Sequence, residues 1–155
     1  QTGVRSAVLQ IDDNAKGGLT TIVFRGVGEY ATTRLAGGGL VPVQPVGYRL
    51  AFGSTPVGTT LKATITITNT SSVVLRFGGD VLSGTNPSDF GFIPGNCAAG
   101  GDEMNPGARC TFIVTFDPSL DVFRTATLMI QDNTEDLGET ISFSGSGTAA
   151  SSGSG

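Results

Sequence analysis

The side chains that could do chemistry in this chain are few, and the densest group is four carboxylates near its C-terminal end. They are Asp132, Glu135, Asp136 and Glu139. Two carboxylates can share general acid and base work when a pocket shifts the pKa of one of them. Here the Asn, Thr and Gly residues around them predict a solvated turn. The chain also has no histidine, so it cannot build a Ser–His or Cys–His nucleophile. We therefore predict no catalytic residue and no enzymatic activity.

The same acidic turn offers oxygen atoms, which are the ligands that calcium prefers. A similar stretch, Asp12, Asp13 and Asn14, occurs near the N-terminus, but Lys16 and two glycines follow it in place of further acids. Neither stretch has the spacing of an EF-hand. We expect ordinary polar turns, with calcium as the alternative, and we predict no metal and no cofactor.

The two cysteines, Cys97 and Cys110, are too far apart for a CxxC metal pair, and no histidine could complete a zinc site. The segment between them contains Gly-Gly and Asn-Pro-Gly, which can fold it back on itself. A disulfide fits this pattern, and two reduced thiols in the core are the alternative. A disulfide persists in an oxidising compartment, so the pattern favours a secreted or cell-surface protein.

The charge of the chain limits its partners. The net charge is −4, with only two lysines and with seven scattered arginines. Nucleic-acid binders need a basic face that displaces counterions from phosphates, so we predict no nucleic-acid partner. No run of 18 apolar residues occurs, and we therefore predict no membrane insertion.

Hydrophobic alternation with a period of two predicts strands, most clearly at residues 61–68 and 109–116. About seven such strands in residues 48–147, separated by Gly, Pro, Asn and Asp turns, predict a seven-stranded immunoglobulin-like sandwich. A hairpin is expected before it. The expected organisation is a hairpin at 1–28, a Gly/Pro linker at 29–46, the sandwich domain at 47–148 and a Gly/Ser tail at 149–155.

The hairpin at the start of the chain is repeated at its end. Residues 4–28 and 123–147 align without a gap, and 11 of the 25 positions are identical. A two-stranded hairpin is marginally stable in water, so the first copy needs a partner that buries its apolar face. We expect this assembly interface to consist of Ala7, Leu9, Ile11, Ile22 and Phe24.

The order of motifs in the second part resembles the Hydin-type (ASH) immunoglobulin-like repeat, also called the choice-of-anchor D domain in bacterial surface proteins. The resemblance covers residues 48–148 and is most specific at "TITN" (66–69), "PGARC" (106–110) and "SGSGT" (144–148). It implies a seven-stranded sandwich in tandem arrays, a Cys97–Cys110 bridge and a structural or binding role without catalysis. It also identifies residues 4–28 as the last two strands of a preceding repeat.

The leading hypothesis is a non-enzymatic structural module of an extracellular bacterial fibre or surface stalk, assembled head to tail through the hairpin. The hairpin either completes the sandwich of preceding residues or another chain, or adds to a sheet edge of a neighbouring copy. Its partners are copies of itself or adjacent repeats.

Two alternatives remain open. The first is an adhesin, or a carbohydrate- or protein-binding module, that contacts a surface ligand through the loops at 78–96 and 98–107. These loops lack tryptophan and tyrosine, which commonly form sugar platforms. The second is an intracellular ciliary or centrosomal role, as in eukaryotic relatives, which the expected disulfide and the scarcity of lysine disfavour.

Overall fold

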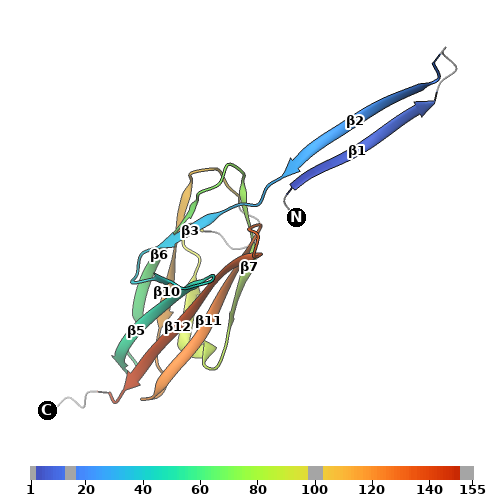
Figure 1. Cartoon of the computed structure of the whole chain (residues 1–155). Coiled ribbons are helices and arrows are strands. Elements are labelled where there is room, and N and C mark those ends of the chain that lie inside the picture. Colours follow the sequence, from blue (N-terminus) through green and yellow to red (C-terminus); the bar gives the residue numbers. More distant parts are fainter. Residues whose placement is uncertain (1–2, 13–16, 98–102, 151–155) are drawn as a thin grey trace. The chain divides into compact units, whose positions relative to one another are not determined.

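The computed structural model describes residues 3–12, 17–97 and 103–150. The fold is all-β, as the sequence predicts, and one short 3-10 helix, η1 (Pro87–Asp89), interrupts the described strands (Figure 1). The chain divides into two compact units, Gln1–Tyr30 and Ala31–Gly155. The tip of the first hairpin, with Asp13 and Asn14, and the end of the predicted tail, residues 151–155, lie outside the described residues.

The first unit is an antiparallel hairpin of β1 (Gly3–Asp12) and β2 (Leu19–Gly28). Its register places Ala7 opposite Phe24 and Leu9 opposite Ile22. Successive side chains of a strand point to opposite faces. The five residues expected at the assembly interface therefore share one face of the hairpin.

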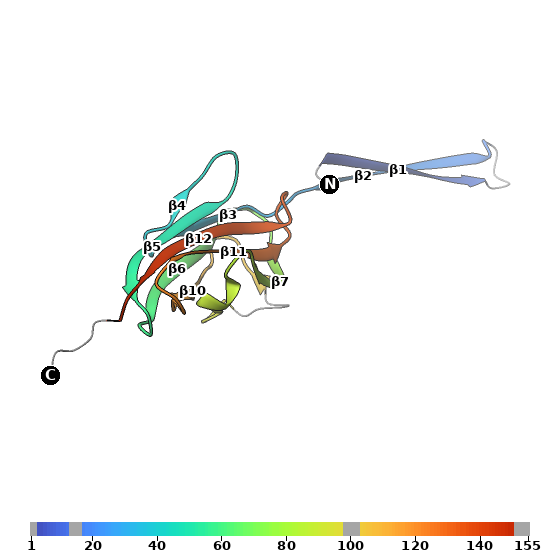
Figure 2. The ribbon, with the colours of Figure 1, turned by 90° about the horizontal axis from the view of Figure 1, so that it is seen from below.

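The second unit is a sandwich of two sheets. One sheet has four strands in the order β3-β6-β10-β8, and the other has six in the order β4-β5-β12-β11-β7-β9. Figure 2 shows β11 and β12 side by side, with β5 next to β12. The longer strands are β5 (Tyr48–Pro56), β6 (Leu61–Asn69), β7 (Leu75–Ser83), β8 (Phe90–Ile93), β10 (Arg109–Phe116), β11 (Phe123–Asp132) and β12 (Gly138–Thr148). The predicted all-β, immunoglobulin-like sandwich is thus confirmed, but the predicted number of seven strands is wrong, because the two sheets have ten among the described residues.

The core lies where the inward side chains of the two sheets meet. The alternation predicted for β6 and β10 is observed, because Ile65, Ile67, Phe112 and Val114 are almost completely buried. An aromatic cluster fills one part of this core. Its ring centroids lie 4.8 Å apart for Phe90 and Phe116, 5.5 Å for Phe52 and Phe116, and 5.7 Å for Phe90 and Phe143.

Residues 29–46 differ from the linker that the sequence predicts. They supply β3 (Thr33–Ala36), which pairs with β6, and β4 (Val41–Pro42), which pairs with β5. Leu35 is the one large apolar residue of β3 that reaches the core, where it is 4% exposed. A strand this short carries too little alternation to be recognised in the sequence.

Residues 78–96, which the sequence predicts to be a loop, contain regular structure. Strand β7 continues through Gly78 and Gly79 to Ser83, and β8 pairs with β10. Phe90 is buried in the core, whereas Ile93 is 46% exposed. A further two-residue strand, β9 (Glu103–Met104), pairs with β7.

Candidate assembly surface

The strands β1 and β2 carry one face that repeats the sequence of the sandwich core. Of the 11 identities between the two hairpins, eight lie on this face and one, Thr21, lies on the other. The remaining two identities lie in the tip. We call this surface the repeated face; it consists of Arg5, Ala7, Leu9, Ile11, Ile22, Phe24, Gly26 and Gly28.

The strand pairing of the two hairpins is also the same. Ala126 lies opposite Phe143 and Leu128 opposite Ile141, which matches the pairing of the first hairpin residue for residue. The two copies are therefore equivalent in register as well as in sequence.

Equivalent side chains of the two hairpins differ in solvent exposure. In the sandwich, Leu128, Ile141 and Phe143 are at most 2% exposed. Their counterparts in the first hairpin, Leu9, Ile22 and Phe24, are 46%, 40% and 52% exposed. Burying one such side chain completely contributes about 1.5–3 kcal/mol, so the open repeated face is a strong candidate for an interface.

The opposite face of the first hairpin has diverged from its counterpart. It carries four exposed valines, Val4, Val8, Val23 and Val27. In the sandwich, the positions of the last three are occupied by Thr127, Ser142 and Ser146. The two copies thus share core-type residues on the repeated face, whereas three polar positions of the opposite face are valines in the first hairpin.

A glycine on the repeated face adds a steric observation that the sequence analysis missed. At Gly145 of β12, an added Cβ would lie 2.5 Å from a ring carbon of Phe116, so the ring packs directly on the glycine backbone. At the equivalent Gly26, an added Cβ would meet nothing within 4 Å. The repeat in the sequence pointed to this glycine, but its significance depends on the position of Phe116.

A buried ion pair lies beside the second hairpin. Arg124 Nε of β11 is 2.9 Å from Asp89 Oδ2 of η1, and both side chains are nearly inaccessible to solvent. The equivalent of Arg124 on the repeated face is Arg5. Nothing in the sequence indicated this pair, because Asp89 lies far from Arg124 along the chain.

Within the sandwich, β11 and β12 are internal strands. Strand β7 pairs antiparallel with β11, and β5 pairs parallel with β12. By contrast, the strands at the four described sheet edges are short: two residues each for β4 and β9, and four each for β3 and β8. They cover only part of the longer strands beside them, so in the described part of the chain residues 50–56 of β5 and 77–83 of β7 have no partner strand on their outer side.

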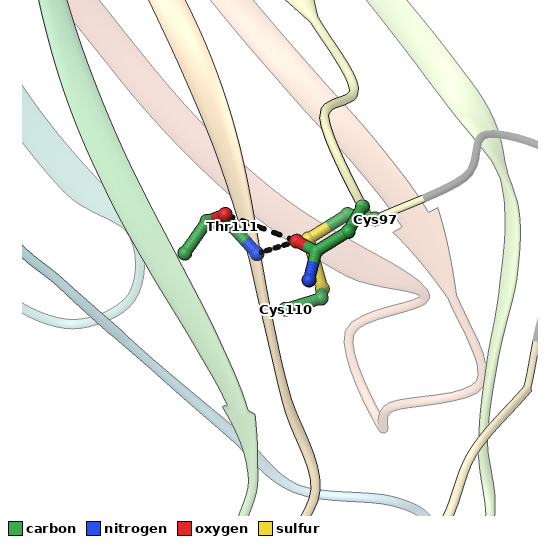
Figure 3. The surroundings of a disulfide bond; sticks show 4 residues. Cys97, Cys110 and Thr111 are labelled. Atoms are coloured by element: carbon green, nitrogen blue, oxygen red, sulfur yellow. Dashed lines mark hydrogen bonds between the residues drawn. A yellow bond between two sulfur atoms is a disulfide. The ribbon is translucent and has the colours of Figure 1, made fainter.

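The predicted disulfide between Cys97 and Cys110 is confirmed, with an S–S distance of 2.03 Å and a Cα–Cα distance of 5.1 Å (Figure 3). The side-chain oxygen of Asn96 beside it accepts hydrogen bonds from the backbone N–H and the hydroxyl of Thr111. The bridge ties β10 to the segment that follows β8. Residues 98–102 of the loop expected to contact a ligand lie outside the described residues.

The acidic turn between β11 and β12 is less exposed than the sequence predicts. Asp132 is 9% exposed, and its Oδ1 accepts a hydrogen bond from the Thr134 N–H. Burial raises the pKa of Asp132, and burial also raises the pKa of Glu139, which accepts a hydrogen bond from the Thr33 hydroxyl. The prediction of a solvated turn is wrong for these two residues, because residues 31–33 pack against the turn.

Calcium is the alternative that the sequence leaves open for this acidic turn. Among residues 3–12, 17–97 and 103–150, no group of three His, Cys, Asp or Glu side chains is arranged to hold a metal ion.

A shallow open pocket of about 350 Å³ lies elsewhere, over β5, β11 and β12, and its lining includes Arg49, Thr125, Thr127, Ser142 and Ser144. No described helix is long and apolar enough to cross a membrane.

The fold and this surface define the class of the protein: an all-β, immunoglobulin-like sandwich preceded by a hairpin that repeats its last two strands. Comparisons with protein-family models and with curated protein sequences give no match. Comparison with solved structures gives matches to the fold.

One match is a protein of unknown function from Porphyromonas gingivalis W83, with a TM-score of 0.57 and 16% identity over 94% of this chain and 66% of that one. Another is the secreted serine protease VesC from Vibrio cholerae, with a TM-score of 0.51 and 15% identity over 71% of this chain and 23% of that one. A third is the ASH/PapD-like domain 7 of human CEP192, with a TM-score of 0.48 and 12% identity over 77% of this chain and 86% of that one. The chain thus spans about two thirds of the first protein and under a quarter of the second.

Proposed function

We propose that this chain is a non-enzymatic structural module of an extracellular bacterial fibre or surface stalk, built from immunoglobulin-like sandwiches of the ASH or choice-of-anchor D type. The observation that carries the proposal is the open repeated face, on which residues of sandwich-core type are exposed. A face of this kind needs a neighbouring domain to cover it. A contact that passes from one module to the next generates a linear array.

The disulfide supports the proposed extracellular compartment. The Cys97–Cys110 bond would be lost in a reducing cytosol, so the proposed site of action is outside the cell.

The structural role is supported by where the carboxylates lie. Asp132 and Glu139 are engaged with neighbouring residues of the same turn and of β3, and they belong to the packing of the sandwich.

The proposal is tested by sedimentation velocity of the whole chain at increasing concentration. Without its neighbour, the chain should self-associate through the repeated face because association buries apolar surface. Phe24→Asp should shift the population towards monomer. Val23→Asp is the matched control, since Val23 is similarly exposed on the opposite face, and it should change association much less. If Phe24→Asp associates as strongly as the unchanged chain, the repeated face is not the assembly surface.

A recognition module is the second candidate, and the pocket over β5, β11 and β12 favours it. The pocket combines the cation of Arg49 with hydroxyl groups of Thr125, Thr127 and Ser142, which could bind a polar or anionic ligand such as a glycan. A glycan array probed with the whole chain tests this function. Binding that Arg49→Ala abolishes would support a recognition module over a purely structural one.

A further inference from the structure

We propose that the hairpin of β1 and β2 is covered by an immunoglobulin-like sandwich that lacks its own last two strands, and that it inserts there as the counterpart of β11 and β12. This inference rests on the proposed array and specifies its partner: a domain equivalent to residues 29–122 of this chain. Addition to the edge of a complete copy, the other arrangement that the sequence left open, is then the outcome that would contradict it.

The first argument comes from the positions of the shared residues. Eight of the 11 identities lie on the face that is buried in the second copy, and the strand register is the same. Edge addition of a hairpin needs backbone hydrogen bonds and has no need of this set of side chains. Insertion into a core needs all of them.

The second argument comes from Gly26. Glycine in the middle of a strand weakens the strand, so it often marks a place where another group approaches the backbone closely. The first hairpin itself gives no such reason, because the space around Gly26 is open. At Gly145 the reason is the ring of Phe116. Insertion would place the partner's counterpart of Phe116 on Gly26.

The third argument comes from the polar end of the same face. Arg124 lies against Asp89 in the sandwich, in a site with almost no solvent access. A partner equivalent to residues 29–122 would carry the counterpart of Asp89, and insertion would bring Arg5 to it. This ion pair would also fix the orientation of the hairpin in the partner.

The fourth argument excludes a complete copy as the partner. Its position between β5 and β7 is already filled by β12 and β11. The open edges of the six-stranded sheet are residues 50–56 of β5 and 77–83 of β7. That sheet already has two strands more than the sheet that faces it, so strands added at its edge would leave Leu9, Ile22 and Phe24 without a facing sheet.

The test is a hybrid chain in which residues 29–122 are placed directly before Val4 of the present chain. Because Val4 is the counterpart of Phe123, the hairpin then follows the added strands as β11 and β12 follow them in the sandwich. Hydrogen exchange of the amides of β1 and β2 is measured in the hybrid and in the unchanged chain. We expect insertion to slow their exchange by about 100-fold or more.

A second hybrid keeps the experiment decisive if the added strands fail to fold. In it, residues 29–147 precede residues 29–155, so the first sandwich receives its own β11 and β12. If the second hybrid folds as two sandwiches while the first leaves β1 and β2 exchanging as in the unchanged chain, the inference is overturned. The inference is also overturned if the amides of β1 and β2 are protected from exchange only when the unchanged chain self-associates.

Gly26→Val in the first hybrid tests the steric argument. We expect it to remove most of the protection, because the valine would occupy the space of the partner's aromatic ring. Val23→Ser, which introduces the counterpart residue on the opposite face, should keep the protection. Equal protection in both variants would contradict the proposed insertion. Glycan binding through Arg49 would refute the structural role and leave this result unaffected, so the two proposals fail separately.

Discussion

Gly26 and Gly145 occupy the same position in two copies of one hairpin, and their surroundings differ. The ring of Phe116 lies against Gly145, so the close packing of the aromatic cluster depends on the absence of a side chain there. Gly26 faces open space. The same residue type is therefore required by packing at one position and is unexplained by packing within the hairpin at the other.

We predict that Gly145→Val lowers the free energy of unfolding of the sandwich by about 1–3 kcal/mol, because the added side chain overlaps Phe116 in a filled core. Urea unfolding followed by far-UV circular dichroism measures the change. Gly26→Val is the matched control and should leave the unfolding midpoint of the sandwich unchanged. A Gly145→Val protein as stable as the control would contradict the close packing described here.

The buried carboxylate of Asp132 gives a second residue-level prediction, on pH. Its pKa is raised above 3.8, first by burial, so in the acid range the folded protein holds a proton that the unfolded chain has lost. The resulting stabilisation is complete below the unfolded pKa and is lost as pH rises through the folded pKa. The wild-type free energy of unfolding should thus carry a contribution that falls with pH in this window.

Asp132→Asn removes this contribution, so its free energy of unfolding relative to wild type should increase as the pH rises from below 3.8 through the raised pKa of Asp132. Urea unfolding at several pH values measures the difference. Glu135→Gln, at an exposed position of the same turn, controls for the loss of one negative charge. A difference between Asp132→Asn and wild type that is independent of pH would show that the carboxyl group titrates normally.

At the scale of elements, the sequence predicts the long alternating strands well. Strands β6 and β10 have four or more inward apolar residues in alternation, and both were assigned with the correct inward faces. The hairpin was assigned for the same reason. The interface residues were chosen from the apolar alternation of the first hairpin, and the same five residue types recur in β11 and β12.

The elements that the sequence analysis missed are held by contacts distant in sequence. Strand β3 has four residues and exists because it pairs with β6, while Gly37 turns the chain tightly against the Thr64 carbonyl with a φ of 105°. Three glycines in this stretch suggested a flexible linker. Likewise, Asp132 is buried in a turn whose Thr134 forms a β-bridge with Ala31 of the predicted linker.

The disulfide gives the prediction at this scale. Cys97 and Cys110 are 13 residues apart, and closing a loop of about this length stabilises a fold by roughly 3 kcal/mol in the chain-entropy model. Replacing both cysteines by alanine should therefore lower the free energy of unfolding by about that amount. Reduction of the wild-type protein should give a similar loss, and reductant should not affect the double variant. A change below about 0.5 kcal/mol would show that the loop is held by its other contacts.

At the scale of the whole molecule, the chain combines a unit with a core and a unit without one. The sandwich buries its apolar residues between two sheets, whereas the hairpin has its largest side chains exposed. A two-stranded hairpin gains little from its own contacts in water. The stability of the molecule should therefore be distributed very unevenly between two stretches of closely similar sequence.

Hydrogen exchange of the unchanged chain at low concentration measures this distribution. We predict that the amides of β11 and β12 exchange at the rate of global unfolding of the sandwich, whereas those of β1 and β2 exchange through local opening and much faster. The two stretches serve as controls for each other because their sequences are so similar. Equal protection in both at low concentration would mean that the hairpin is stable without a partner.

The short edge strands of both sheets affect how readily the molecule associates at high protein concentration. Proteins at high density collide often. Long unpaired edge strands would let them associate by strand pairing into irreversible cross-β stacks. Here each described sheet edge carries a strand of two or four residues, which covers part of the longer strand beside it. If the chain forms the proposed stalks, these short strands would shorten the edge through which neighbouring stalks could pair sideways.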